Sequence, residues 1–98
     1  MKYTVDVKEL ARDNVTEAFL YYESKQQGLG ERFLLCWEKH LASLQQEPNL
    51  YQKKYKDFRQ VIIKPYPYHI IYEIEELVIV VYKVIYAGRH SRKRYTKK

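Results

Sequence analysis

Four side chains in the C-terminal half of the chain have the types that cleavage of RNA without a metal requires: Arg59, His69, Arg89 and Tyr95. In that reaction a 2′-hydroxyl attacks its neighbouring phosphate, so a base, an acid and cations near the phosphate are all needed. We assign the base or acid role to His69, the phosphate to Arg59 and Arg89, and base stacking or proton transfer to Tyr95. Arg59 and His69 would lie on paired strands if the turn Pro65–Pro67 closes a hairpin.

Each of these side chains also has a structural interpretation, which the sequence leaves open. A histidine such as His69 is common on the surface of a strand. Arg59 could pair with Glu73 or Asp57 across a sheet. Tyr95 lies in a terminal segment, and such segments are often disordered.

Positive charge is concentrated at the C-terminus. The 98 residues include 18 Lys+Arg and 12 Asp+Glu, which gives a formal net charge of +6. The basic tail, residues 87–98, holds six Lys/Arg and no acid, so the rest of the chain is electrically balanced. A neutral body with a cationic end is typical of a protein that meets a polyanion. The side chains that we expect to contact nucleic acid are Lys53, Lys54, Lys56, Lys64, Arg92, Lys93 and Arg94.

Several classes of site and location are not indicated. The histidines and the single Cys36 have no metal-ligand spacing, and no Gly-rich phosphate loop is visible, so any enzyme here is expected to need no metal and no cofactor. Cys36 cannot form an internal disulfide, which favours a reducing compartment and hence the cytoplasm. The longest apolar run, Leu77–Tyr86, is interrupted by Lys83 and is far too short to cross a membrane.

The pattern of apolar residues predicts a strand followed by two helices. Lys2–Val7 alternates between apolar and polar residues, as a strand does. Apolar residues at helical spacing follow in Ala11–Tyr22 and again in a second helix from about Glu31 to Gln46. Gly28–Gly30 separates the two helices and Pro48 ends the second, which predicts an antiparallel helical hairpin.

Three further strands follow a polar connection, Asn49–Asp57. They are Phe58–Lys64, Tyr68–Ile74 and Leu77–Tyr86, joined by tight turns into an antiparallel meander. The last is apolar on both faces and is therefore predicted to be central. The fold class is α+β, with the helices on one face of the sheet. The other face must be solvated, form a working surface or be covered by another chain.

Short motifs stand in a fixed order along nearly the whole chain. They include a paired Tyr-Tyr near the end of the first helix, a Gly-x-x-Phe that opens the second, and an Arg that ends the last strand. In order, they occupy residues 11–23, 30–33, 47–49, 58–59, 67–74 and 84–89.

This arrangement resembles the RelE/ParE toxin superfamily of bacterial type II toxin–antitoxin, or plasmid stabilisation, systems. The resemblance implies a single toxin domain over residues 1–98, with the basic tail at its end. Such proteins are similar in fold and differ in target. One branch enters the ribosomal decoding site and cuts messenger RNA, whereas another poisons DNA gyrase.

The residues of the nuclease branch are partly present. Arg89 and Tyr95 stand at matching positions, but His69 takes the place of an Arg. The usual Lys-x-Lys of the second strand is missing, which leaves Arg59 and Lys64. On balance the resemblance favours ribosome-dependent cleavage of messenger RNA. The alternatives are gyrase inhibition by binding without catalysis, and a family member that has lost its toxicity.

The resemblance also implies protein partners. A cognate antitoxin would fold on binding, by laying a helix into a groove or by adding a strand to a sheet edge. The ribosome with its messenger RNA, or gyrase, would be the second partner, and no membrane is expected. The oligomeric state is left open between a homodimer and a toxin–antitoxin hetero-oligomer. Five tyrosines either form the antitoxin groove or pack the helices on the sheet: Tyr21, Tyr22, Tyr51, Tyr55 and Tyr66.

Overall fold

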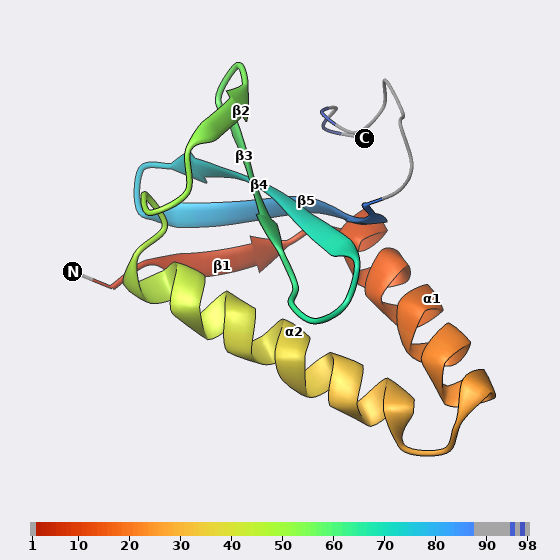
Figure 1. The fold of residues 1–98 in the computed structure, drawn as a ribbon. Coiled ribbons are helices and arrows are strands. Elements are labelled where there is room, and N and C mark those ends of the chain that lie inside the picture. The colour runs from red at the N-terminus through yellow and green to blue at the C-terminus, as the bar shows by residue number, and fades with distance from the viewer. Residues whose placement is uncertain (1, 88–94, 96, 98) are drawn as a thin grey trace.

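Two helices lie on one face of a five-stranded sheet in the computed structural model, which describes residues 2–87, 95 and 97 (Figure 1). The strand order is β1-β5-β4-β3-β2; β1 runs parallel to β5 and the other neighbours are antiparallel. The predicted α+β class and the central position of the last strand are confirmed. The elements are β1 (Thr4–Val7), α1 (Glu9–Lys25), α2 (Leu29–Gln46), β2 (Lys53–Tyr55), β3 (Phe58–Ile62), β4 (Tyr68–Glu75) and β5 (Val78–Tyr86).

The short strand β2 was not predicted. It lies inside the connection Asn49–Asp57, and all three of its residues are exposed. It pairs with β3 through Lys53 opposite Arg59 and Tyr55 opposite Phe58. Because β2 buries no apolar face, its sequence has no alternation that could reveal it. The predicted three-stranded meander is therefore a four-stranded antiparallel unit.

Glycines set the turn between the helices. Gly28 adopts φ 93°, a left-handed conformation that favours glycine. The carboxylate of Glu23 accepts hydrogen bonds from the N–H groups of Gly28 and Gly30, at 3.0 Å in each case. A Cβ atom on Gly30 would lie 2.7 Å from the ring of Phe19 and 2.8 Å from its carbonyl oxygen. The predicted helical hairpin is thus confirmed, with a close helix contact that requires glycine.

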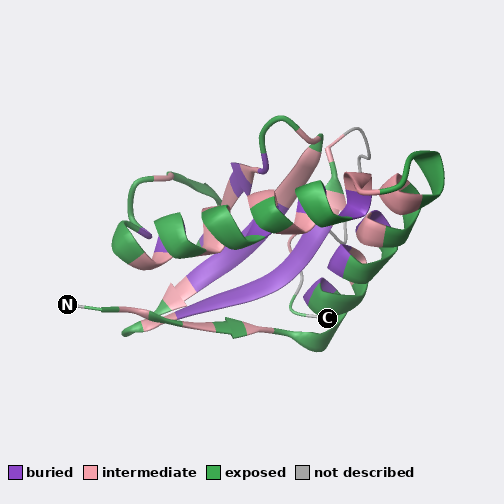
Figure 2. Cartoon of the chain, turned by 90° about the horizontal axis from the view of Figure 1, so that it is seen from below, coloured by how far each residue is buried: buried purple, intermediate pink, exposed green. Residues whose placement is uncertain are grey.

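The main core lies between the helices and the sheet. Figure 2 shows the two long central strands buried and the outer surfaces of the helices exposed. Aromatic rings, small helix residues and β-branched strand residues fill this layer. Its buried members are Ala11, Val15, Ala18, Phe33, Trp37, Leu44, Val61, Ile63, Ile70, Tyr72, Ile79, Val81 and Val84.

The second face of the sheet carries a smaller cluster, formed by Phe58, Ile71, Val80 and Tyr82. Tyr95, from the C-terminal tail, packs against it. This face was expected to be solvated, to form a working surface or to be covered by another chain, and coverage by the same chain was not predicted. Part of the second face is in fact covered by the end of the tail.

Candidate functional site

His69 lies on β4, opposite Ile62 of β3 and Ile85 of β5. Since side chains alternate along a strand, His69 shares the second face with Ile71. It lines a groove of about 650 Å³ along the outer edge of β3, where β2 no longer pairs. Lys64 lines the same groove.

The groove is suited to an anion. Lys54, Lys64, His40 and His69 all line it, and none of its described lining residues is acidic. Nδ1 of His40 lies 2.8 Å from the carbonyl oxygen of Cys36, which can only accept a hydrogen bond, so this nitrogen carries the proton. Two predicted phosphate contacts and one predicted catalytic residue therefore meet in one groove.

Arg59 points to the opposite face of the sheet. It pairs with Tyr72, which belongs to the main core. Its guanidinium donates to the carbonyl oxygen of Tyr51 and to Oδ1 of Asn49, the latter at 3.3 Å. The hydroxyl of Tyr72 donates to the carbonyl oxygen of Pro48 at 2.8 Å. Arg59 and Tyr72 thus hold the segment that follows α2, and Arg59 is not brought together with His69.

Burial makes the hydroxyl of Tyr72 less acidic. Removal from water raises the pKa of the Tyr72 hydroxyl to about 12, although the positive charge of Arg59 acts in the opposite direction. Tyr72 is therefore a neutral hydrogen-bond donor at physiological pH. Arg59 and Tyr72 both bond to the segment that follows α2, so this arrangement can stabilise the fold.

Tyr95 lies on the same face of the sheet as His69. Its ring stacks on Tyr55 with 5.4 Å between ring centres, and it lies 6.0 Å from the ring of Phe58. Its hydroxyl donates to Oε1 of Gln60 at 2.8 Å. Gln60 also lines the groove beside His69, so these two candidates lie near one another through Gln60.

A polar cluster on the second face was missed by sequence analysis. The β4–β5 register shifts between Ile71 and Tyr72, which adds one residue to β5 and leaves Tyr82 and Lys83 both buried. The hydroxyl of Tyr82 lies 3.0 Å from Glu73 and 3.2 Å from Glu75, and burial followed by the bond to Glu73 raises the pKa of Tyr82. A bulge changes the face of each following residue, and alternation alone could not reveal it.

The tail also contacts this cluster. Nζ of Lys97 lies 3.3 Å from Oε1 of Glu73, a carboxylate that is otherwise buried, and 5.9 Å from the centre of the Tyr82 ring. Together with Tyr95, this contact ties the end of the tail to the second face. The sheet face that carries His69 is therefore partly occupied by the chain itself.

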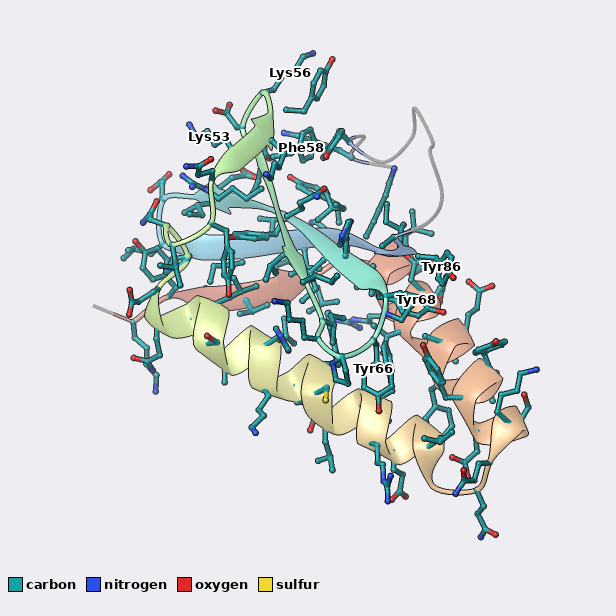
Figure 3. All side chains as sticks on the ribbon, in the orientation of Figure 1. Lys53, Lys56, Phe58, Tyr66, Tyr68 and Tyr86 are labelled. Atoms are coloured by element: carbon teal, nitrogen blue, oxygen red, sulfur yellow. The ribbon has the colours of Figure 1, made fainter. Side chains whose placement is uncertain are left out.

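Of the remaining predicted residues, two lie on the hairpin of β2 and β3 and four lie outside the described residues. Lys53 forms an ion pair with Asp57 at 3.1 Å, and Lys56 lies over the ring of Tyr55. Figure 3 shows Lys53 and Lys56 on the hairpin of β2 and β3, which projects away from the helices. The other predicted contacts lie outside the described residues: Arg89, Arg92, Lys93 and Arg94. Within the described part of the chain, no group of three or more His, Cys, Asp or Glu could hold a metal ion.

Comparison with known families decides the relationship. A family model described as "ParE toxin of type II toxin-antitoxin system, parDE" matches residues 5–91. The chain belongs to the ParE toxin family. No curated protein matches the chain. Membership of this family implies a cognate antitoxin as a partner.

Two solved structures share the fold of this ParE-family toxin. The first is a chain of the chromosomal ParDE toxin–antitoxin system from P. aeruginosa, with 10% sequence identity and a TM-score of 0.77. That match covers 88% of this chain and 97% of the other. The second is the E. coli toxin RelE, a mutant in the free state, with 17% identity and a TM-score of 0.58, covering 90% of this chain and 86% of that one.

Five tyrosines were predicted either to form the antitoxin groove or to pack the helices on the sheet, and three of them, Tyr22, Tyr51 and Tyr66, pack against the main core. Tyr22 and Tyr66 pack against Phe33 in the main core, at centre distances of 5.6 Å and 5.3 Å, and burial raises the pKa of Tyr22 to about 12. Tyr21 and Tyr55 are exposed. Among the described residues, no helix is long and apolar enough to span a membrane.

Proposed function

We propose that this toxin arrests growth by binding a protein target, DNA gyrase, and that it does not cleave RNA. The observation that carries the proposal is the position of Arg59. A nuclease site would need its cations around one phosphate. Arg59 instead lies on the helix side of the sheet, where it bonds to Tyr51 and Asn49, away from His69.

The missing Lys-x-Lys of β3 supports the same proposal. Inside β3, the residues between Arg59 and Ile62 are Gln60 and Val61, and Gln60 already bonds to Tyr95. Cleavage without a metal relies on cations and a proton-transfer pair held in a fixed geometry. A toxin that binds a protein needs neither, so these replacements are compatible with binding.

The experiment is induced expression of the chain in a bacterial host. Two readouts run in parallel: covalent gyrase–DNA complexes, and mapped ends of messenger RNA. Gyrase–DNA complexes without new RNA ends support the proposal. Cuts inside translated codons would refute it, and growth that continues unchanged would indicate a family member without toxicity in that host.

Ribosome-dependent cleavage is the second candidate, and the groove beside His69 favours it. Lys54, Lys64 and His40 line the same groove as His69, and none of its described lining residues is acidic, which suits a phosphate. In this case His69 would move a proton, Arg89 would hold the phosphate and Tyr95 would stack on a base. A matched pair of variants, His69→Ala and His40→Ala, separates the roles: codon-specific cuts that vanish only with His69→Ala would establish the nuclease.

A further inference from the structure

We propose that a pocket between α1 and the end of β5 binds an arginine side chain of a partner protein. The pocket has a volume of about 330 Å³ and lies apart from the groove beside His69. Three tyrosine rings and one carboxylate line it: Tyr21, Tyr68, Tyr86 and Glu17. The inference does not depend on whether the toxin's target is gyrase or the ribosome.

The pocket exists because β5 is longer than its neighbour β1. Beyond the four residues that pair with β1, the edge of β5 faces α1. Oδ1 of Asn14 on α1 accepts a hydrogen bond from the N–H of Val84 at 3.0 Å. The N–H of Ala87 donates to the carbonyl oxygen of Pro67 on the β4 side. The carbonyl oxygen of Tyr86 belongs to the same trans peptide unit, so it points the other way, toward the side of the pocket.

Aromatic rings form one wall. Tyr68 and Tyr86 meet edge to face, 5.8 Å between centres, and Figure 3 shows both where the sheet meets α1. Tyr86 is 48% exposed and Tyr21 is 53% exposed, so both rings can be reached from solvent. Nζ of Lys25, which does not line the pocket, lies 5.1 Å from the centre of the Tyr21 ring, so this ring already attracts one cation.

The carboxylate of Glu17 supplies the charge. Glu17 is exposed, and within the described part of the chain no cation or hydrogen-bond donor pairs with it. Its neighbours at three and four positions along α1 offer no cation, since they are Asp13, Asn14, Leu20 and Tyr21. An acidic group with no local partner, set beside two exposed tyrosine rings, attracts a cation and repels phosphate.

Arginine fits this combination better than lysine. Its planar guanidinium can stack on a tyrosine ring and, at the same time, donate two parallel hydrogen bonds to a carboxylate. Remaining N–H groups can reach backbone carbonyls at the open edge of β5. A lysine has one compact charge and no planar surface, so it could pair with the carboxylate but could not stack on a tyrosine ring.

The test is a titration of the full chain with a blocked Gly-Arg-Gly peptide, followed by the NMR signals of Tyr21, Tyr68 and Tyr86. The control peptide carries citrulline, which has the shape of arginine without its charge. We expect saturable shifts at millimolar peptide with arginine and none with citrulline. Glu17→Gln should weaken the arginine peptide about two- to fivefold, as the loss of one exposed ion pair does. Glu38→Gln, which removes an exposed carboxylate outside the pocket, should leave the affinity unchanged.

Two results would overturn the proposal. The first is equal binding of the citrulline peptide, or no difference between Glu17→Gln and the parent chain. The second is a gain in affinity for the arginine peptide when Arg89 is replaced by glutamine, together with the same tyrosine shifts. That result would mean that the chain's own tail, and not a partner, supplies the cation.

Discussion

Replacing Arg59 with alanine tests whether this side chain supports the fold or acts on a target. Its guanidinium bonds to the carbonyl oxygen of Tyr51 and to Oδ1 of Asn49. A hydrogen bond to a charged group contributes roughly 1.5–3 kcal/mol, and less when a partner is exposed, as Asn49 is. We therefore expect Arg59→Ala to lower the free energy of unfolding by about 1–3 kcal/mol.

Urea unfolding measures this change. Trp37 is the only tryptophan and is buried in the main core, so its fluorescence reports on the packing of α2. For a domain of this size, urea slopes of about 1–1.5 kcal/mol per molar place the expected shift of the midpoint at about 0.7–3 M. Arg32→Ala removes an exposed arginine with no contact to this segment and should leave the midpoint unchanged.

The functional readout decides between the two roles. If Arg59 is structural, growth inhibition per folded molecule should equal that of the parent chain at a temperature where Arg59→Ala is fully folded. An unchanged midpoint combined with lost growth inhibition would refute the reasoning and restore a direct role for Arg59. A double-mutant cycle with Asn49→Ala should then show no coupling, whereas the structure predicts a measurable one.

Three other predictions address the turn, a buried hydroxyl and the tail. Gly30→Ala should destabilise the fold by about 1–3 kcal/mol, because the new methyl group meets the backbone of Phe19; Gly28→Ala, with open space but φ 93°, should cost less. If urea unfolding shows that Gly30→Ala lowers the free energy of unfolding by less than about 0.5 kcal/mol, as a surface substitution does, the close contact between the helices is contradicted. The pKa of Tyr72 is raised to about 12 in the folded state, so the contribution of the neutral hydroxyl to stability is complete below pH 10 and is lost as pH rises through about 12. Tyr72→Phe should therefore reduce the fall in the free energy of unfolding at alkaline pH. Identical pH profiles for the variant and the parent chain would show that Tyr72 does not cause this fall. Tyr95→Ala should increase binding of a hydrophobic dye to the second face, whereas Tyr95→Phe, which keeps the stacking, should not; equal dye binding by both variants would contradict the covering role.

Local signals in the sequence were sufficient for the order of the main elements. Gly28 and Pro48 bound the second helix because one favours a left-handed turn and the other cannot continue a helix. The apolar residues of Leu77–Tyr86 on both faces required a central strand, and β5 is central. Such signals depend on a residue and its near neighbours, which is why sequence alone could reveal them.

Three features depended on pairing between distant residues. The face of Arg59 is fixed by its register opposite Tyr72, and only the apolar Val61 two residues later hinted at the helix side. The strand β2 exists through its pairing with β3 and buries nothing of its own. The bulge that places Tyr82 beside Glu73 follows from a shift in the β4–β5 register. No local pattern contains this information.

The groove beside His69 and the pocket at the end of β5 differ in charge, which bears on the nature of the partner that each would fit. The groove at the edge of β3 is lined by Lys54 and Lys64 without described acids, whereas the pocket at the end of β5 presents Glu17. A nucleic acid carries one sign of charge and could satisfy only the groove, since the carboxylate would repel its phosphates. A protein surface with acidic and basic side chains in register could satisfy both at once. The charge reversals Lys64→Glu and Glu17→Lys should therefore each weaken the binding of a protein partner. Binding of a polyanion should be weakened by Lys64→Glu and strengthened by Glu17→Lys. Binding assays at several salt concentrations can distinguish these opposite effects from the loss in both variants that a protein partner should show.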